Sequence, residues 1–168
     1  MDDNLKVGGL CSEYKPGFFL PSHRVAMGLK ARDSFEAIRE LCGLLEGDPD
    51  VVDIKALRSA LIRRERVEST ALGNGVAVPH AHSNGVRSLV VCLGISKRGV
   101  EFYAADGGPV YIVAMVCAPD RNFRDYLGYV KKLARTLGQE EVQEALLEAR
   151  SPKEVVDVLC TGGRDDAP

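Results

Sequence analysis

The stretch Leu72-Gly73-Asn74-Gly75-Val76-Ala77-Val78-Pro79-His80 joins a turn, a strand and an imidazole in direct succession. Asn74-Gly75 favours a tight turn, because both residues tolerate positive φ. The apolar run 76–78 predicts a short strand, and Pro79 keeps the residue before it extended. His80 is therefore expected to leave the sheet at a fixed point, which is how a reactive imidazole would be presented.

Two helices are predicted on the N-terminal side of this stretch. The first runs from Ser34 to Glu46, carries its apolar residues on one face, and follows Asp33, which forms a capping box with a glutamate three positions later. The second runs from about Val52 to Arg66. Residues 1–18 are interpreted as a loose lead-in, followed by a short strand near residues 24–28.

The pattern beyond the stretch changes from strands to helices. Continuous apolar runs predict strands over residues 89–95, 100–102 and 110–117. Amphipathic spacing and capping signals predict helices over residues 123–137, 140–149 and 152–159. This order predicts the α/β (α+β) class, with about five strands in one mixed sheet covered by helices on both faces. A single domain is expected over residues 19–160, followed by a disordered tail over residues 161–168.

Composition excludes several classes of function. The chain has 22 Lys and Arg against 24 Asp and Glu, and its net charge of −2 favours neither nucleic acid nor an anionic membrane. We therefore expect no nucleic-acid partner and no membrane insertion. The five cysteines are widely spaced without a Cys-x-x-Cys pair, so neither a disulfide framework nor a cysteine zinc site is expected. Reduced thiols and an N-terminus without signal-peptide features indicate the cytoplasm.

The chain resembles the enzyme IIA domains of the mannitol/fructose/nitrogen-related type in the phosphoenolpyruvate-dependent phosphotransferase system (PTS). The resemblance spans about residues 19–159 and implies the mannitol-type IIA fold. Its most specific element is Gly-x-Gly-x-Ala-x-Pro-His at residues 73–80. The other matching elements are Arg64-Glu65, Ser69-Thr70, the strand that ends at Pro119, and the helix opened by Ser151-x-x-Glu154.

The resemblance implies a phosphocarrier that uses no cofactor and no metal. His80 matches the family's phosphoryl-accepting histidine, which is loaded by the carrier protein HPr or its paralogue and unloaded by a cysteine of an enzyme IIB partner. Neutral imidazole suits this role because it is a nucleophile with an ordinary pKa of about 6.5. Arg64 matches the family's phosphate-facing arginine, and a guanidinium can hold two phosphate oxygens at once. Beside Arg63 and Arg66, it could also be part of a solvated helix end.

The family's second histidine, which contacts the phosphoryl group, falls on Tyr126 in this chain. A tyrosine donates one hydrogen bond but carries no positive charge, so stabilisation of phosphohistidine would be weaker. Tyr126 also lies on an apolar helix stripe and could be a core residue. His82 is a possible helper, because residues 80 and 82 share one side of an extended chain. The alternative for His82 is a solvent-facing loop residue.

Three functions remain open from the sequence. The first is phosphoryl transfer through His80. The second is a regulatory IIA-like module that docks to target proteins, favoured by the replacement of the second histidine. The third is a small metal-binding protein using His80 and His82, for which no third ligand is identifiable. The sugar, if there is one, is not readable from the sequence.

Overall fold

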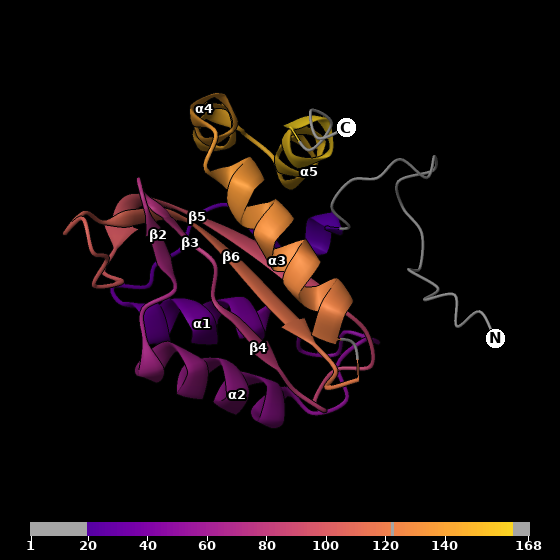
Figure 1. Ribbon diagram of the computed structural model, residues 1–168. Coiled ribbons are helices and arrows are strands. Elements are labelled where there is room, and N and C mark those ends of the chain that lie inside the picture. The colour runs from indigo at the N-terminus through magenta and orange to yellow at the C-terminus, as the bar shows by residue number, and fades with distance from the viewer. Residues whose placement is uncertain (1–19, 122, 163–168) are drawn as a thin grey trace.

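A six-stranded mixed sheet runs through residues 20–121 and 123–162, the part of the chain that the computed structural model describes (Figure 1). Its strands are β1 (Val25–Ala26), β2 (Ala71–Gly73), β3 (Val76–Ala77), β4 (His80–His82), β5 (Val90–Val100) and β6 (Val110–Ala118). The long antiparallel pair β5–β6 is the centre of the sheet. The strand order is β1-β5-β6-β3-β2, and β4 lies off this path and pairs with β6. Strands β3 and β4 follow one another along β6, and both are parallel to it.

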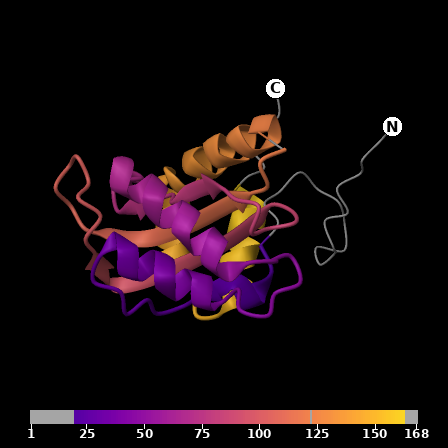
Figure 2. The same cartoon turned by 90° about the horizontal axis from the view of Figure 1, so that it is seen from below.

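Helices cover both faces of the sheet, as the sequence predicts (Figures 1 and 2). On one face lie α1 (Ser34–Gly43) and α2 (Ile54–Val67), and on the other lie α3 (Phe123–Leu137), α4 (Glu140–Glu148) and α5 (Pro152–Gly162). The first two helices begin at aspartate N-caps. Asp33 accepts the N–H of Glu36 at 2.8 Å, and Asp53 accepts the N–H groups of Lys55 and Ala56 at 3.0 Å each.

Alternation along the strands divides the core into two layers. Ala77, Ala81 and Met115 pack with α1 and α2, whereas Val78 and Val116 pack with α3, α4 and α5. Successive side chains of a strand point to opposite faces, so even-numbered positions in 76–82 face the α3 side. This alternation determines which face the two histidines of β4 occupy.

The prediction that His80 leaves the sheet is wrong, because His80 begins β4 and pairs with Val116 of β6. Pro79 only interrupts the expected strand, since the chain returns to the ladder immediately after it. Residues 100–102 do not form a separate strand either. β5 continues to Val100 with a shift in its register to β6, passing Gly99 at a φ of 84° that favours glycine.

The observed ends of the helices differ less from the predicted ones. α1 ends at Gly43, three residues before the expected end, and turns lead on to Gly47. α5 continues through Thr161 to Gly162, so the first two residues of the expected tail are helical. The rest of that tail and the lead-in over residues 1–18 lie outside the described residues. No helix in residues 20–121 or 123–162 combines the length and apolar character needed to cross a membrane.

A buried ion-pair cluster joins the N-terminal segment to the loop between α1 and α2. Arg24 is 2% exposed and donates from Nε and Nη2 to the Asp48 carboxylate at 2.8 Å each. Its Nη2 also donates to Asp50 at 2.8 Å, and Ser88 donates to the same Asp50 side chain. This cluster fixes the loop from which α2 begins.

Candidate functional site

Strand β4 carries both histidines of the signature on the side of the sheet that faces α3. His80, Ala81 and His82 pair with Val116, Cys117 and Ala118 of β6. Ala81 packs with the helices of the opposite face, so the flanking histidines point away from it. In the described part of the chain β4 pairs only with β6, and it lies between α2 and α3 (Figure 1). Side chains from both helices can therefore reach His80.

The ring of His80 is held in one tautomer. Its Nδ1 lies 2.7 Å from the carbonyl oxygen of Val78. A carbonyl oxygen only accepts hydrogen bonds, so Nδ1 carries the proton and donates it. In the neutral ring the lone pair is then on Nε2. The ring is partly buried, and Nε2 is the nitrogen left for chemistry.

Burial keeps this imidazole neutral. Loss of solvent lowers the pKa of His80 below its ordinary value of 6.5, and the positive charge of Arg64 lowers it further. The hydrogen bond to Val78 and the charge of Glu65 oppose this shift without reversing it. The imidazole of His80 is therefore neutral at pH 7.

Tyr126 of α3 lies against both imidazoles. Its ring centroid is 4.1 Å from that of His82 and 6.1 Å from that of His80, and both ring pairs are tilted. Tyr126 is 3% exposed and packs with the core of this face. Burial raises the pKa of its phenol well above the usual range, so the hydroxyl stays neutral. Tyr126 is thus both a core residue and a neighbour of the two histidines.

Arg64 approaches from the opposite side of β4, in the last turn of α2. Its positive charge acts on both rings, because it adds to the lowered pKa of His80 and partly offsets the raised pKa of Tyr126. Nη1 donates to the carbonyl of Glu68 at 2.9 Å and so helps to fix the end of the helix. This bond uses one of the five donors of the guanidinium.

The structure brings together all four residues that the sequence singles out: His80, His82, Arg64 and Tyr126. His82 does not lie on a solvent-facing loop, since it is in a strand and packs against Tyr126. The carbonyl of Val78, which selects the tautomer of His80, could not be predicted from the sequence. Within residues 20–121 and 123–162, no group of three or more His, Cys, Asp or Glu side chains is arranged to hold a metal ion.

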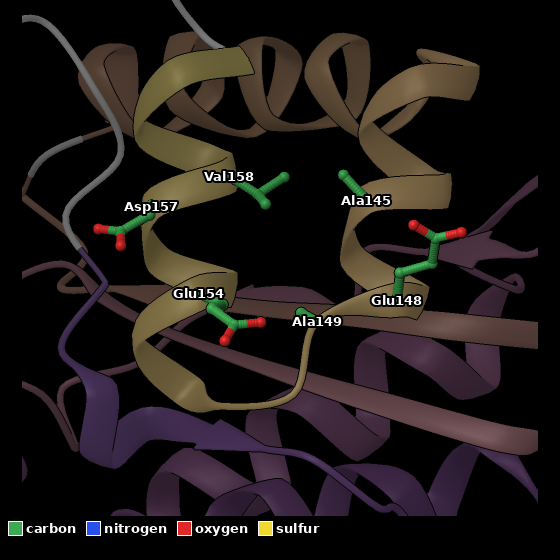
Figure 3. A pocket seen from close by; sticks show the side chains of 6 residues that line it. All are labelled: Ala145, Glu148, Ala149, Glu154, Asp157 and Val158. Carbon is green, nitrogen blue, oxygen red and sulfur yellow. The ribbon is translucent and has the colours of Figure 1, made fainter.

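An open groove of about 390 Å³ lies between α4 and α5 (Figure 3). Ala145 and Val158 point toward one another across it, and Glu154 contributes a carboxylate. Asp157, also at the groove, already pairs with Lys153 at 2.8 Å. An acidic lining repels phosphate, so the groove does not suit phosphoryl chemistry.

Comparison with known families matches residues 18–161 to the phosphoenolpyruvate-dependent sugar phosphotransferase system, EIIA 2. The chain belongs to this family. This is a phosphocarrier family of the phosphotransferase system, which supports a role in phosphoryl transfer. The match also confirms the family expected from the motifs at residues 64–80.

Two curated relatives illustrate the range of the family. The EIIA domain is 36% identical over 124 residues to the fructose-specific EIIA component of Haloferax volcanii, covering 74% of this chain and 80% of that protein. It is 29% identical over 140 residues to the fructose-specific EIIABC component of Bacillus subtilis, covering 83% of this chain. It spans only 22% of the length of the Bacillus protein.

Two solved structures confirm the mannitol-type fold. The nitrogen regulatory protein IIA-Ntr from Neisseria meningitidis superposes with a TM-score of 0.77 at 27% identity, covering 83% of this chain and 94% of that one. IIA mannitol from Escherichia coli superposes with a TM-score of 0.72 at 26% identity, covering 84% of this chain and 99% of that one. The EIIA domain therefore resembles both sugar-specific IIA proteins and a nitrogen regulatory IIA protein.

Proposed function

We propose that His80 is the phosphoryl acceptor of this EIIA domain, loaded by a phosphorylated HPr-like carrier and unloaded by a cysteine of a IIB domain. The observation that carries this proposal is the Nδ1–H bond to the carbonyl of Val78, which leaves the lone pair on Nε2. The IIB partner is suggested by the EIIABC relative, whose name joins the A, B and C components in one protein.

Each step exchanges one bond to phosphorus for another. The neutral Nε2 of His80 attacks the phosphorus, and the bond between phosphorus and the donor nitrogen breaks as the donor keeps its electron pair. In the onward step a cysteine thiolate attacks the same phosphorus, and Nε2 recovers its lone pair. Such transfers need positioning and charge stabilisation more than covalent assistance.

Arg64 supplies the positive charge at this site. A guanidinium near His80 compensates the charge of the equatorial oxygens in a loose transition state. Tyr126 takes the place of the family's second histidine and donates at most one neutral hydrogen bond. His82, whose tilted ring lies 4.1 Å from that of Tyr126 between centroids, brings a second imidazole to the site from a different backbone position. We propose His82 as a helper in holding the phosphoryl group.

A regulatory role is the second candidate. The similarity to IIA-Ntr of Neisseria meningitidis and the neutral phenol of Tyr126 both favour it. In that case the domain acts by docking to target proteins, with His80 unmodified. We also propose that the domain works in the cytoplasm, where thiols stay reduced, because the buried thiols of Cys42, Cys92 and Cys117 take part in no disulfide.

Intact-mass measurement separates the two candidates. The full chain is incubated with phosphoenolpyruvate, enzyme I and HPr, beside a control IIA protein. Transfer predicts a gain of one phosphoryl group that is lost in acid, as expected for phosphohistidine. No gain under conditions that label the control contradicts phosphoryl transfer and leaves the docking module.

The rate of loading depends on the protonation of His80. Because burial lowers the pKa of His80 below 6.5, we expect a nearly constant rate from about pH 8 to about pH 7 and a decline to half at a pH below 6.5. Protonation removes the Nε2 lone pair, so the decline follows the lowered pKa. Single-turnover loading from phosphorylated HPr, normalised to the control IIA protein, measures this profile. A rate that already halves between pH 8 and pH 7 would contradict a lowered pKa.

Substitution of Tyr126 tests whether a cationic side chain at this position would stabilise phosphorylated His80. Tyr126→His restores a group that can become cationic, and we expect the lifetime of phosphorylated His80 to rise about tenfold, since hydrogen bonds from charged donors are stronger. Tyr126→Phe keeps the packing and removes only the hydroxyl, so it is the matched control and should shorten the lifetime slightly. Hydrolysis of the phosphorylated protein, followed by mass, gives both lifetimes. Equal lifetimes in all three proteins would show that this position does not touch the phosphoryl group.

A further inference from the structure

A continuous chain of hydrogen bonds joins the imidazole of His80 to the helix that carries Arg64. Nδ1–H of His80 donates to the carbonyl of Val78 at 2.7 Å, and the N–H of Val78 donates to the carbonyl of Thr70 at 3.1 Å. Thr70 donates its own N–H and its hydroxyl to the two carboxylate oxygens of Glu65, at 3.2 and 2.6 Å. Glu65 directly follows Arg64 in α2.

The burial of Glu65 needs an explanation. Glu65 is 6% exposed and Thr70 is 5% exposed, so a carboxylate is removed from water and bonded to an uncharged side chain. Burial of a charged group is costly, and apolar residues of similar volume would fill the same space more cheaply. The bidentate contact does, however, hold the Thr70 backbone in a defined position. The carbonyl of Val78 is one hydrogen bond away from that backbone.

We propose that Glu65 and Thr70 are positioning residues for phosphoryl transfer at His80. They fix the Thr70 backbone, which orients Val78 so that its carbonyl selects the Nδ1–H tautomer and leaves Nε2 as the nucleophile. The same contact anchors the turn of α2 that brings Arg64 to the site. This inference rests on the proposed function of His80, because it concerns how that nitrogen is prepared.

Ser69 provides an internal contrast to Thr70. Its hydroxyl also donates to a buried partner, the carbonyl of Phe102, but that bond leads away from His80. Ser69→Ala therefore removes a neighbouring hydroxyl bond without interrupting the chain to the imidazole. Thr70→Val keeps the shape of the side chain and removes the hydroxyl, whereas Thr70→Ser keeps the hydroxyl.

The test is the tautomer of His80, read from the ¹⁵N shifts of its ring in the unphosphorylated full chain. We expect one Nδ1–H tautomer in the native chain, Thr70→Ser and Ser69→Ala, and a mixture of tautomers in Thr70→Val. A single native tautomer in Thr70→Val would overturn the proposal. If Thr70→Val does not fold, Glu65→Gln replaces it, since it keeps the side-chain shape and changes the acceptor of the Thr70 hydroxyl.

The kinetics of loading then distinguish an effect on the orientation of His80 from an effect on the binding of phosphorylated HPr. We expect kcat for loading to fall about tenfold in Thr70→Val, with an unchanged KM for phosphorylated HPr. A tenfold loss is the lower end of the losses seen when the hydrogen-bond partner that orients a functional histidine is removed. Unchanged kcat would overturn the proposal. Failure of the proposed function has a different signature, because the native chain then gains no phosphoryl group while the tautomer measurement still decides the role of Thr70.

Discussion

Replacing His80 by alanine is expected to abolish the gain of a phosphoryl group from phosphoenolpyruvate, enzyme I and HPr. The fold should survive, because His80 is partly buried at the edge of the sheet and its ring bonds to a backbone carbonyl of its own segment. Intact mass under the conditions that load the native chain measures the effect. Loading should fall below detection, since the substitution removes the imidazole whose Nε2 carries the lone pair.

The matched control is His23→Gln. His23 lies outside the site, where its Nε2 is 3.1 Å from Oδ2 of Asp48. It tests whether loss of any histidine affects loading, and full loading is expected. A native level of acid-labile phosphoryl group in His80→Ala would contradict the assignment and would direct attention to His82, the remaining imidazole beside Tyr126.

Local signals in the sequence were sufficient for much of this architecture. The aspartate N-caps, the long apolar runs and the glycine turn act within a few residues, so α1, α2, β5 and β6 could be predicted near their true positions. The short strand before Pro79 was also readable, but the return of the chain to the sheet at His80 was not. What the local signals could not provide was the partner of each short segment.

Strand β4 illustrates the limit. The segment His80–His82 is three residues long and two of them are histidines, so nothing in it favours a strand. It becomes a strand because β6 continues to Ala118 and offers an open edge beside it. The tautomer of His80 is hidden for the same reason. It depends on the direction of the Val78 carbonyl, which only the folded backbone determines.

The site itself was predictable as a set of residues but not as a mechanism. Resemblance to the family brought together Arg64, His80 and Tyr126, and the alternation of an extended strand added His82. Their geometry shows how Tyr126 serves the fold and lies at the site together. The phenol packs in the core of the α3 face and still lies beside both imidazoles. If Tyr126 occupies the position of the family's second histidine, as we propose, the change preserves the packing of the domain and alters only the charge beside His80.

Asp48→Ala is expected to have the largest effect on stability. It leaves Arg24 buried at 2% exposure with only Asp50 as a charged partner, and the Nη1 of Arg24 already lacks a partner among the described residues. Breaking one partner of a buried pair leaves an uncompensated charge and costs about 3–5 kcal/mol. For a domain of this size, Tm should fall by on the order of 10 °C. Urea unfolding gives the free energy directly.

The control for this prediction is Asp157→Ala, which removes an ion pair of the same 2.8 Å length. Lys153 and Asp157 are 80% and 59% exposed, so solvent screens their attraction and no measurable change is expected. Similar losses in the two variants would contradict the argument that burial, and not contact distance, decides the contribution of these pairs.

Acidic pH provides a second test of the buried cluster of Arg24, Asp48 and Asp50. Burial alone would raise the pKa of Asp48, but hydrogen bonds from Arg24, the Asp50 backbone and His23 outweigh it and hold the pKa well below its usual value of 3.8. A carboxyl with a lowered pKa in the fold stabilises the protein above its unfolded pKa and loses this contribution as the pH falls toward the lowered value. The gap in unfolding free energy between the native chain and Asp48→Ala should therefore be full at neutral pH and shrink below about pH 4. A gap that stays constant into acid would show that Asp48 acts through packing and not through its charge.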